Sequence, residues 1–187
     1  KNGEIQLILF EGQNALMNAA KQAGYDQKSE IWDMQFDFDD ELDYPLPEGF
    51  HFVSPKECDM DKISKCCWKG FDHEQNEGVW NHQYEQNNYL LEVAPHATVD
   101  MAVIIADEKG EYACYAGMWW TPENKLAYME PLCTIPEYRH RGLASAALSE
   151  LYRRTKALGA THMTGGVNDF YKAIGYKPAV KWTYWKK

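Results

Sequence analysis

The stretch IPEYRHRGLA at residues 135–144 decides the fold of this chain and the class of ligand that it can bind. It joins a run at 126–134, which predicts a strand, to an apolar stripe over 142–158, which predicts a helix. The first N–H groups of a helix have no partner inside the helix, and together with the helix dipole they attract phosphate oxygens. The stretch therefore predicts a phosphate-binding loop between a strand and a helix.

Four residues of this loop favour an anionic ligand. Gly142 and the small Ala144 let a ligand approach the main chain closely, and Arg139 and Arg141 add positive charge. The loop lacks the glycine pattern of dinucleotide sites and the lysine of P-loops. On spacing alone, an ordinary basic helix start is nearly as well supported as a phosphate site.

The rest of the chain supplies further strands and helices. Apolar runs between turn residues predict strands, and capping residues before an apolar stripe predict helices. Turns at 107–110 and 122–125 join consecutive strands and so predict an antiparallel meander. The predicted strands are 50–53, 101–106, 112–120, 126–134, 162–164 and 180–185, and the predicted helices are 59 or 61 to 70, 79–86, 142–158 and 169–174.

The first 44 residues repeat the order of elements found at the end of the chain. A strand, a helix and a strand are predicted there, and Gly24-Tyr25 recurs as Gly175-Tyr176. These three elements are predicted at 5–10, 14–23 and 30–38. We therefore expect the tail of a first domain at 1–44, a linker at 45–49 and a complete domain at 50–187.

Composition excludes several classes of protein. With 187 residues, 45% hydrophobic and 14% aromatic, the chain can bury a core, so it is not disordered throughout. Its longest aliphatic run, 101–106, is too short to cross a membrane, and we expect no membrane partner. The five cysteines show no metal-ligand spacing, so we expect reduced thiols, a cytoplasmic protein and no metal site.

Charge is unevenly distributed along the chain. The net charge is −9, yet residues 138–187 hold 2 acidic and 10 basic residues, a local charge of +8. This segment could form a cradle for a small phosphorylated ligand, a solvated basic face or a nucleic-acid surface. A pI of 5.1 argues against broad polyanion binding, so no nucleic-acid partner is expected.

Three motifs, in sequence order, resemble those of the GNAT superfamily of acyl-CoA-dependent N-acyltransferases. Arg139-x-x-Gly142-x-Ala144 matches the Arg/Gln-x-x-Gly-x-Gly/Ala signature of that family, and 130–134 and 170–176 look like its fourth strand and its ending. The resemblance covers residues 47–187. In the tandem members of the family two such domains are fused, and residues 1–44 would then be the end of the first domain. It implies an α/β (α+β) fold with a twisted, mixed, mostly antiparallel sheet, flanked by helices and splayed between its fourth and fifth strands.

The resemblance also implies acetyl-CoA as co-substrate, with no metal. Its pyrophosphate would lie on the loop amides, and its pantetheine arm would pair with the fourth strand. Asn168 stands three residues before Tyr171, whereas the family often has an asparagine further upstream, so this spacing departs from the pattern. The implied cofactor-binding residues are Leu132, Cys133, Thr134, Arg139, His140, Arg141, Gly142, Leu143, Ala144, Ser145 and Asn168.

Acyl transfer to an amine needs a base, because an ammonium ion cannot attack a thioester. By resemblance, Glu130 takes that proton, directly or through water, and Tyr171 protonates the leaving thiolate. A backbone N–H near Leu132 or Cys133 would polarise the thioester carbonyl. The competing interpretations are a solvent-facing carboxylate at Glu130 and a packed core aromatic at Tyr171.

The expected function is N-acetylation of a primary amine, with a small molecule as the favoured acceptor. Residues 63–137 hold 12 acidic and 4 basic residues and many aromatic side chains, which suits an amine with an apolar body. Taken one at a time, each aromatic residue is explained more simply by core packing. His73 and His82 are likewise explained more simply as surface or packing residues than as substrate contacts. The alternative function is a non-catalytic acyl-CoA-binding sensor or interaction module. The aromatic residues are Trp68, Phe71, Trp80, Tyr84, Tyr89, Trp119, Trp120 and Tyr128.

Overall fold

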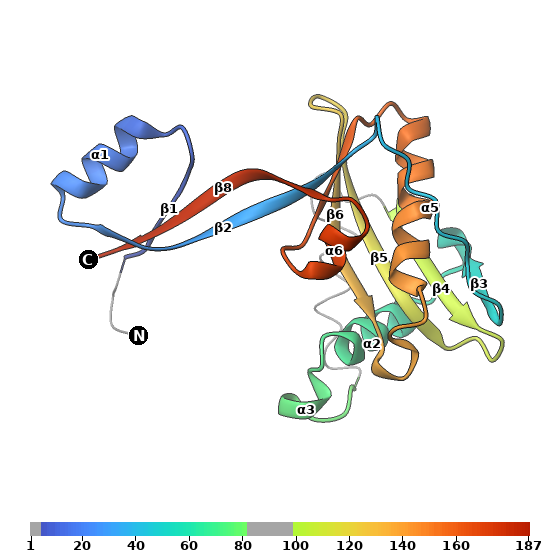
Figure 1. The fold of residues 1–187 in the computed structure, drawn as a ribbon. Coiled ribbons are helices and arrows are strands. Elements are labelled where there is room, and N and C mark those ends of the chain that lie inside the picture. Colours follow the sequence, from blue (N-terminus) through green and yellow to red (C-terminus); the bar gives the residue numbers. More distant parts are fainter. Residues whose placement is uncertain (1–4, 82–98) are drawn as a thin grey trace. The chain divides into compact units, whose positions relative to one another are not determined.

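The computed structural model describes residues 5–81 and 99–187 and divides the chain into two compact units. Unit 1 contains the residues up to Phe36 together with Thr164–Lys187, and unit 2 contains Asp37–Met163 (Figure 1). Unit 2 therefore holds the whole predicted phosphate-binding loop and the strand and helix on either side of it.

Unit 2 is built on the antiparallel meander that the two turns predict. Each of its first four strands is hydrogen-bonded to the next, and the short strand β7 (His162–Gly165) starts parallel to β6. The mixed, mostly antiparallel sheet expected from the sequence is confirmed. The four strands are β3 (Phe50–Val53), β4 (Val103–Asp107), β5 (Tyr112–Thr121) and β6 (Leu126–Thr134).

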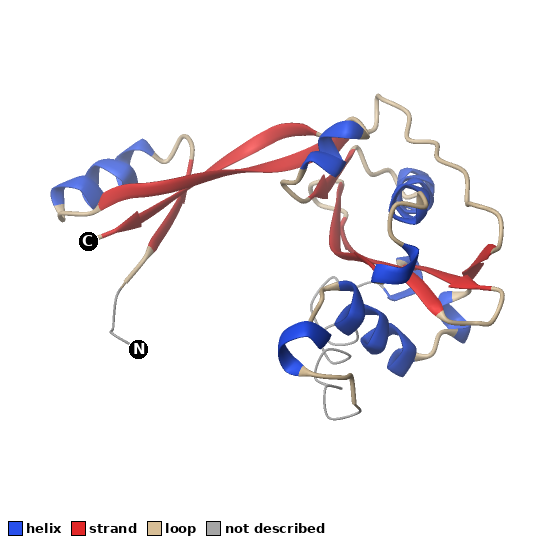
Figure 2. Cartoon of the chain, turned by 60° about the horizontal axis from the view of Figure 1, so that its bottom comes forward, coloured by secondary structure: helices blue, strands red, loops and turns tan. Residues whose placement is uncertain are grey.

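Helices cover both faces of this sheet (Figure 2). α2 (Met60–Gly70) begins at Asp59, whose carboxylate accepts hydrogen bonds from two first-turn N–H groups, as predicted for a capping residue. Its apolar side packs on the sheet around Tyr115 and Cys133, and α5 (Leu143–Ala157) buries its own stripe on the opposite face. No helix among the described residues is long and apolar enough to cross a membrane. Short 3-10 turns lie at Pro55–Glu57, Val99–Met101 and Pro136–Tyr138.

The helix predicted over 79–86 is wrong in its described part. Val79 to Asn81 are not helical, and the remainder of that range lies outside the described residues. The short helix of this region is α3 at Glu74–Glu77. It ends at Gly78, whose φ of 88° cannot continue a right-handed helix.

Strands β6 and β7 separate after their first residues. Within the described chain they pair only at Leu126 with His162 and at Ala127 with Met163. The edge of β6 at Leu132–Thr134 therefore has no strand partner on that side among the described residues. The splay expected between the fourth and fifth strands is confirmed, and it leaves backbone groups of β6 available to a ligand.

In unit 1, the two ends of the chain form one antiparallel sheet. The last strand, β8 (Lys177–Lys186), lies between β1 (Leu7–Phe10) and β2 (Asp26–Asp37). The strand–helix–strand order predicted for the start of the chain is confirmed, and the chain's own last strand completes its sheet. That residues 1–44 are the tail of a first domain stays a prediction. The helices of this unit are α1 (Asn14–Gln22) and α6 (Asp169–Ala173).

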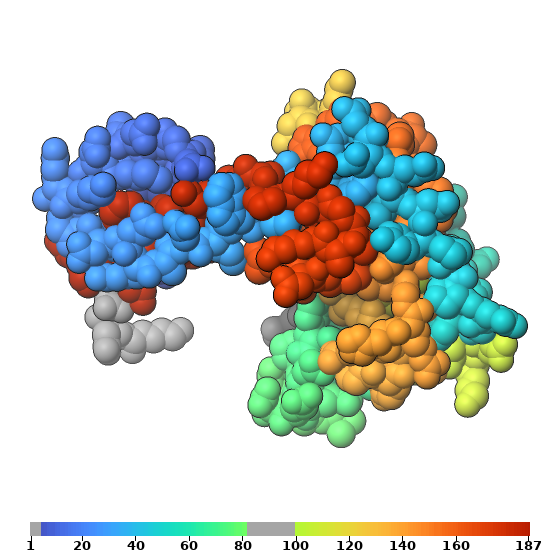
Figure 3. Space-filling view, in the orientation of Figure 1, coloured from blue at the N-terminus to red at the C-terminus, as the bar shows by residue number. Residues whose placement is uncertain are grey.

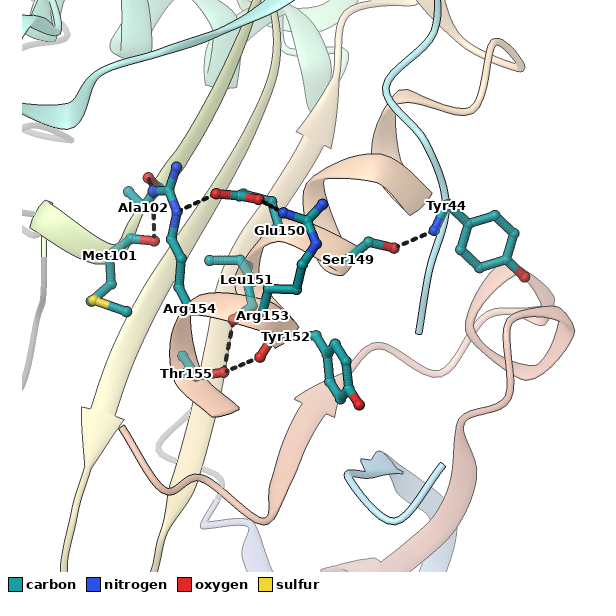
Figure 4. A network of polar contacts seen from close by, with 10 residues as sticks. All are labelled: Tyr44, Met101, Ala102, Ser149, Glu150, Leu151, Tyr152, Arg153, Arg154 and Thr155. Atoms are coloured by element: carbon teal, nitrogen blue, oxygen red, sulfur yellow. Dashed lines mark hydrogen bonds and ion pairs between the residues drawn. The ribbon is translucent and has the colours of Figure 1, made fainter. Parts of the chain in front are cut away.

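Polar contacts hold neighbouring segments of unit 2 on α5 (Figure 4). The backbone N–H of Tyr44 donates to Ser149 Oγ at 2.9 Å. Arg154 donates to the Ala102 carbonyl at 2.7 Å and to the Glu150 carboxylate at 2.8 Å. Because these bonds use basic side chains for structure, the charge of +8 over residues 138–187 overstates what a ligand could meet.

Candidate functional site

α5 begins in a backbone conformation suited to anion binding. Gly142 is left-handed, with φ of 84° and ψ of 2°, and His140 has φ of 61°. No side chain of the described residues caps the first turn of the helix. Successive N–H groups in turns that mix right- and left-handed residues form concave donor surfaces for anions. The residues present therefore fit a diphosphate at the start of α5.

The side chains of this first turn divide into core-facing and outward groups. Leu143 is buried in the core, so only its N–H can serve a ligand, whereas Ala144 and Ser145 are half-buried. Gly142 is exposed, and a Cβ there would lie 3.7 Å from Pro47 Cγ, an ordinary contact. Glycine is therefore required at 142 by its left-handed backbone and not by lack of space.

Arg139 has a structural role that the sequence does not predict. Its Nη2 donates to the Asp72 carboxylate and to the Gly70 carbonyl, each at 2.9 Å. Its Nε donates to the Thr134 carbonyl at 3.2 Å, and its backbone N–H bonds to the Pro136 carbonyl. The guanidinium thus ties the end of α2 to the end of β6, where the green and orange segments abut in Figure 3. Because its charge is paired with Asp72, it offers a phosphate less than expected.

His140 and Arg141 are exposed at the same turn. The Arg141 guanidinium lies 5.2 Å from the centre of the Tyr138 ring, a cation–π distance. The Tyr138 hydroxyl donates to the Asp107 carboxylate at 2.6 Å, which lowers the pKa of Asp107 and raises that of Tyr138. A fixed ring thus holds Arg141 near the start of α5, where its charge can meet an anion.

The open edge of β6 offers backbone groups at alternate residues. The Ile135 N–H donates to the Ala113 carbonyl at 3.0 Å, so the backbone of Ile135 points toward β5. Since antiparallel pairs alternate, Cys133 also pairs toward β5, and Leu132 and Thr134 point to the open edge. The Thr134 carbonyl already accepts from Arg139, so the groups that this edge offers a ligand are the N–H and carbonyl of Leu132 and the N–H of Thr134.

A β-bulge interrupts β6 directly before this edge. Ala116 is opposite Leu132 and Met118 is opposite Met129, so β6 has one residue more than β5 between these pairs. The bulge lies at the Glu130-Pro131 step, where the proline has no N–H to give to a regular ladder.

Gly117 on β5 makes this bulge possible. A Cβ at Gly117 would lie 2.3 Å from the Glu130 carbonyl oxygen and 2.9 Å from Pro131 Cδ, far inside any real contact. Our reading of the sequence did not single out Gly117. An isolated glycine within a strand is nevertheless a signal of a bulge or a close backbone approach, and it could have found this residue.

The Glu130 carboxylate sits beside the bulge with part of its surface in solvent. The surrounding protein still removes enough water to raise its pKa, because desolvation disfavours the charged form. A carboxylate with a raised pKa is a better proton acceptor near neutral pH than an ordinary glutamate. The exposed Glu130 carboxylate thus combines a raised pKa with its expected place on the strand, and its role as base stays a prediction.

Tyr171 lies in unit 1, where its ring packs on two glycines. A Cβ on Gly165 would lie 2.6 Å from Tyr171 Cδ1, and one on Gly166 would lie 2.7 Å from its Cε2. The ring is buried and stands 5.2 Å from that of Tyr176, at an angle of 72°. Asn168 is exposed just before α6, and its side chain does not cap that helix. The packing fixes the Tyr171 ring, and its acid role stays a prediction.

Tyr176 carries a buried hydroxyl that the sequence does not single out. Among the described residues its Oη has no hydrogen-bond partner. Burial raises its pKa well above the ordinary value, so the group is a neutral donor. An unpaired buried hydroxyl is destabilising, typically by about 1–3 kcal/mol.

Three cysteines meet in the core between α2 and β6. Cys133 Sγ lies 4.0 Å from the sulfur atoms of both Cys66 and Cys67. All are free thiols, and hydrogen bonding among them together with burial raises the pKa of Cys67 and Cys133 well above the usual range. Neutral buried thiols are poor nucleophiles, so this cluster fills the core. No group of side chains that could hold a metal ion occurs among the described residues.

The aromatic residues expected near the acceptor have different roles. The Trp68 indole N–H donates to the Gly78 carbonyl at 2.9 Å, and the Trp80 indole N–H donates to Ser64 Oγ at 3.1 Å. Both bonds hold the segment after α2 against that helix. His73 stacks on Trp68 at 4.7 Å, as expected for a packing residue. The other ring pair described here joins Trp119 to Tyr128, whose centres lie 5.8 Å apart. Tyr84, Tyr89 and His82 lie outside the described residues.

Several solved structures share this fold. A GCN5-related N-acetyltransferase from Sphaerobacter thermophilus has a TM-score of 0.69 at 14% identity, over 98% of this chain and 60% of its own. A tandem GNAT protein from the clavulanic acid biosynthesis pathway has a TM-score of 0.67 at 14% identity, over 98% and 63%. One from Kribbella flavida has a TM-score of 0.56 at 16% identity, over 98% and 68%. This chain thus spans less than two thirds of the first two proteins.

No curated protein matches the chain. At these identities the structural likeness establishes the fold alone. The model of the acetyltransferase (GNAT) family matches residues 59–176, which is more than half of the chain and includes the loop, the bulge and the splayed edge. The chain therefore belongs to the GNAT acetyltransferase family.

Proposed function

We propose that this protein is an N-acetyltransferase that moves the acetyl group of acetyl-CoA to a primary amine of a small molecule in the cytoplasm. The observation that carries the proposal is the place of the exposed Glu130 carboxylate on the β6 bulge, next to a strand edge whose backbone groups face outward. A base and an open strand edge at one place are what direct transfer requires.

The start of α5 supports binding of the diphosphate of the donor. The uncapped first-turn amides and the left-handed Gly142 supply N–H donors, and Arg141 adds charge from the surface. The outward N–H of Leu132 is placed to pair with the pantetheine arm or with the thioester carbonyl. We propose the other residues expected from the sequence as neighbours of the same ligand: Cys133, Thr134, Arg139, His140, Leu143, Ala144, Ser145 and Asn168.

The reaction is a single displacement at the thioester carbonyl carbon. Glu130 takes a proton from the acceptor ammonium, directly or through water, and the freed nitrogen lone pair forms the new C–N bond. The C–S bond breaks, its electrons stay on sulfur, and Tyr171 gives a proton to the thiolate. Atoms and charge balance, since the proton that Glu130 gains and the one that Tyr171 loses return through solvent. Desolvation of Glu130 favours the first step, because it raises the proton affinity of the carboxylate.

A thiol-release assay with acetyl-CoA and a panel of primary amines tests the proposal. We expect turnover, a rate that rises with pH through the raised pKa of Glu130, and a loss of about 100-fold in Glu130→Gln at neutral pH. Glu123→Gln, an exposed carboxylate in the β5–β6 turn, is the matched control and should keep the full rate. Binding of CoA without turnover on any amine would instead establish the non-catalytic acyl-CoA-binding module.

Folding stability provides an independent check on the Glu130→Gln variant. A raised pKa in the folded state means that the protonated carboxyl favours folding below the ordinary glutamate pKa, and that this contribution is lost as pH rises through the folded value. Glutamine mimics the protonated form. We therefore expect the variant to melt no lower than the parent at neutral pH, so that its loss of rate reports chemistry and not unfolding.

A further inference from the structure

The aromatic pair Trp119 and Tyr128 lies on the same face of the sheet as Glu130. Tyr115 faces α2, and side chains alternate along a strand, so Gly117 and Trp119 of β5 point to that face too. Tyr128 is directly opposite Trp119. Two residues further along β6, before the bulge shifts the register, the same alternation brings Glu130 to this face.

On this face of the sheet, the β5 position between Tyr115 and Trp119 is a glycine. Tyr115 is covered by α2, whereas the next position on that face of β5, Gly117, has no side chain. Glu130 stands beside this glycine, because the Gly117 Cβ position lies 2.3 Å from the Glu130 carbonyl oxygen. A ligand that reaches the carboxylate here would rest on backbone, with the two rings as its next neighbours.

Both rings keep part of their surface exposed. Tyr128 is 41% exposed and Trp119 is half-buried. Their centres lie 5.8 Å apart with planes tilted by 41°, so they present a continuous apolar wall. Such a wall favours flat apolar groups by area and aromatic groups by edge and face contacts.

We propose that the Trp119–Tyr128 pair binds the body of the acceptor, and that the preferred acceptors are primary amines that carry an aromatic ring. This inference rests on the proposed function, because it takes Glu130 as the place of the amine nitrogen. Tyr128 and Glu130 are two positions apart on β6, so their Cα atoms are about 7 Å apart along the strand. A ring joined to the nitrogen by two or three carbons spans that distance, with its plane against the wall.

Steady-state acetylation of two probes tests this inference. The probes are 2-phenylethylamine and n-butylamine, which have similar amine basicity and differ in the ring. We expect a kcat/KM for 2-phenylethylamine about tenfold above that for n-butylamine. Trp119→Ala should lower kcat/KM for 2-phenylethylamine far more than for n-butylamine, so that the ratio falls to about one, and Trp119→Phe should restore most of the ratio. Trp32→Ala, which removes an exposed tryptophan from β2, is the matched control and should leave the ratio unchanged.

The outcomes separate this inference from the proposed function. Turnover of both amines at equal kcat/KM, or an aromatic preference that survives in Trp119→Ala, would refute the aromatic wall and leave the acetyltransferase proposal standing. Absence of turnover on every amine, with acetyl-CoA bound, would refute the acetyltransferase proposal and the acceptor site with it. Trp119→Leu, which removes the ring and keeps an apolar side chain, should also lose the preference and keeps the test decisive if the alanine variant does not fold.

Discussion

Replacing Gly117 by alanine should disturb the bulge on which Glu130 sits. The new methyl carbon would lie 2.3 Å from the Glu130 carbonyl oxygen and 3.0 Å from its carbonyl carbon. Both atoms belong to the main chain of a paired strand, so no side chain can rotate away. Carbon atoms in contact normally stay about 3.5 Å apart or more, so β6 must move outward by roughly 1 Å.

The expected magnitudes follow from that displacement. Overpacking of this kind costs about 1–3 kcal/mol, and near the middle of that range the melting temperature falls by about 4–8 °C for a domain of this size. A shift of about 1 Å at a reacting group can lower the rate about 100-fold. Thermal melting followed by circular dichroism measures the first effect, and thiol release with the best amine of the panel measures the second.

A second glycine provides the control. Gly12 has nothing within 4 Å of its Cβ position but has φ of 98°, so Gly12→Ala loses stability through its backbone alone. We expect that variant to melt lower while keeping its rate below the transition. If Gly117→Ala kept both its melting temperature and its rate, the close packing of β5 against the bulge would not exist and the placement of Glu130 would be wrong.

Three further predictions concern the start of α5 and the tyrosines of unit 1. Gly142→Val places a β-branched residue at φ of 84°, which costs about 1–2 kcal/mol and closes the approach to the amides, so calorimetry should show loss of CoA binding in a folded protein. Normal CoA affinity in that variant would contradict the anion site. Tyr176→Phe removes a buried hydroxyl that lacks a partner among the described residues, so the free energy of unfolding should rise by about 1 kcal/mol in urea titrations. Tyr171→Phe should instead slow thiolate release with little change in CoA affinity, and a full rate would leave Tyr171 as packing alone.

Much of unit 2 follows from local sequence. The turns at 107–110 and 122–125 and the apolar runs between them predicted the meander, because two strands joined by a tight turn can hardly avoid pairing. The start of α5 was predicted from the glycine that ends the loop, since its left-handed backbone is a local property. Local signals failed over 79–81, where Gly78 and the hydrogen bond of Trp80 to Ser64 determine the path of the chain.

The amino-acid sequence by itself determined the order of the strands of unit 2, the glycine-led start of α5 and the presence of a carboxylate on β6. Those features depend on neighbouring residues, whose propensities act over a few positions. Only the tertiary structure decided that Arg139 is paired with Asp72 and that Gly117 faces the Glu130 bulge. Asp72 stands 67 residues from Arg139 and Gly117 lies on a different strand from Glu130, so each pairing depends on how whole elements pack against one another.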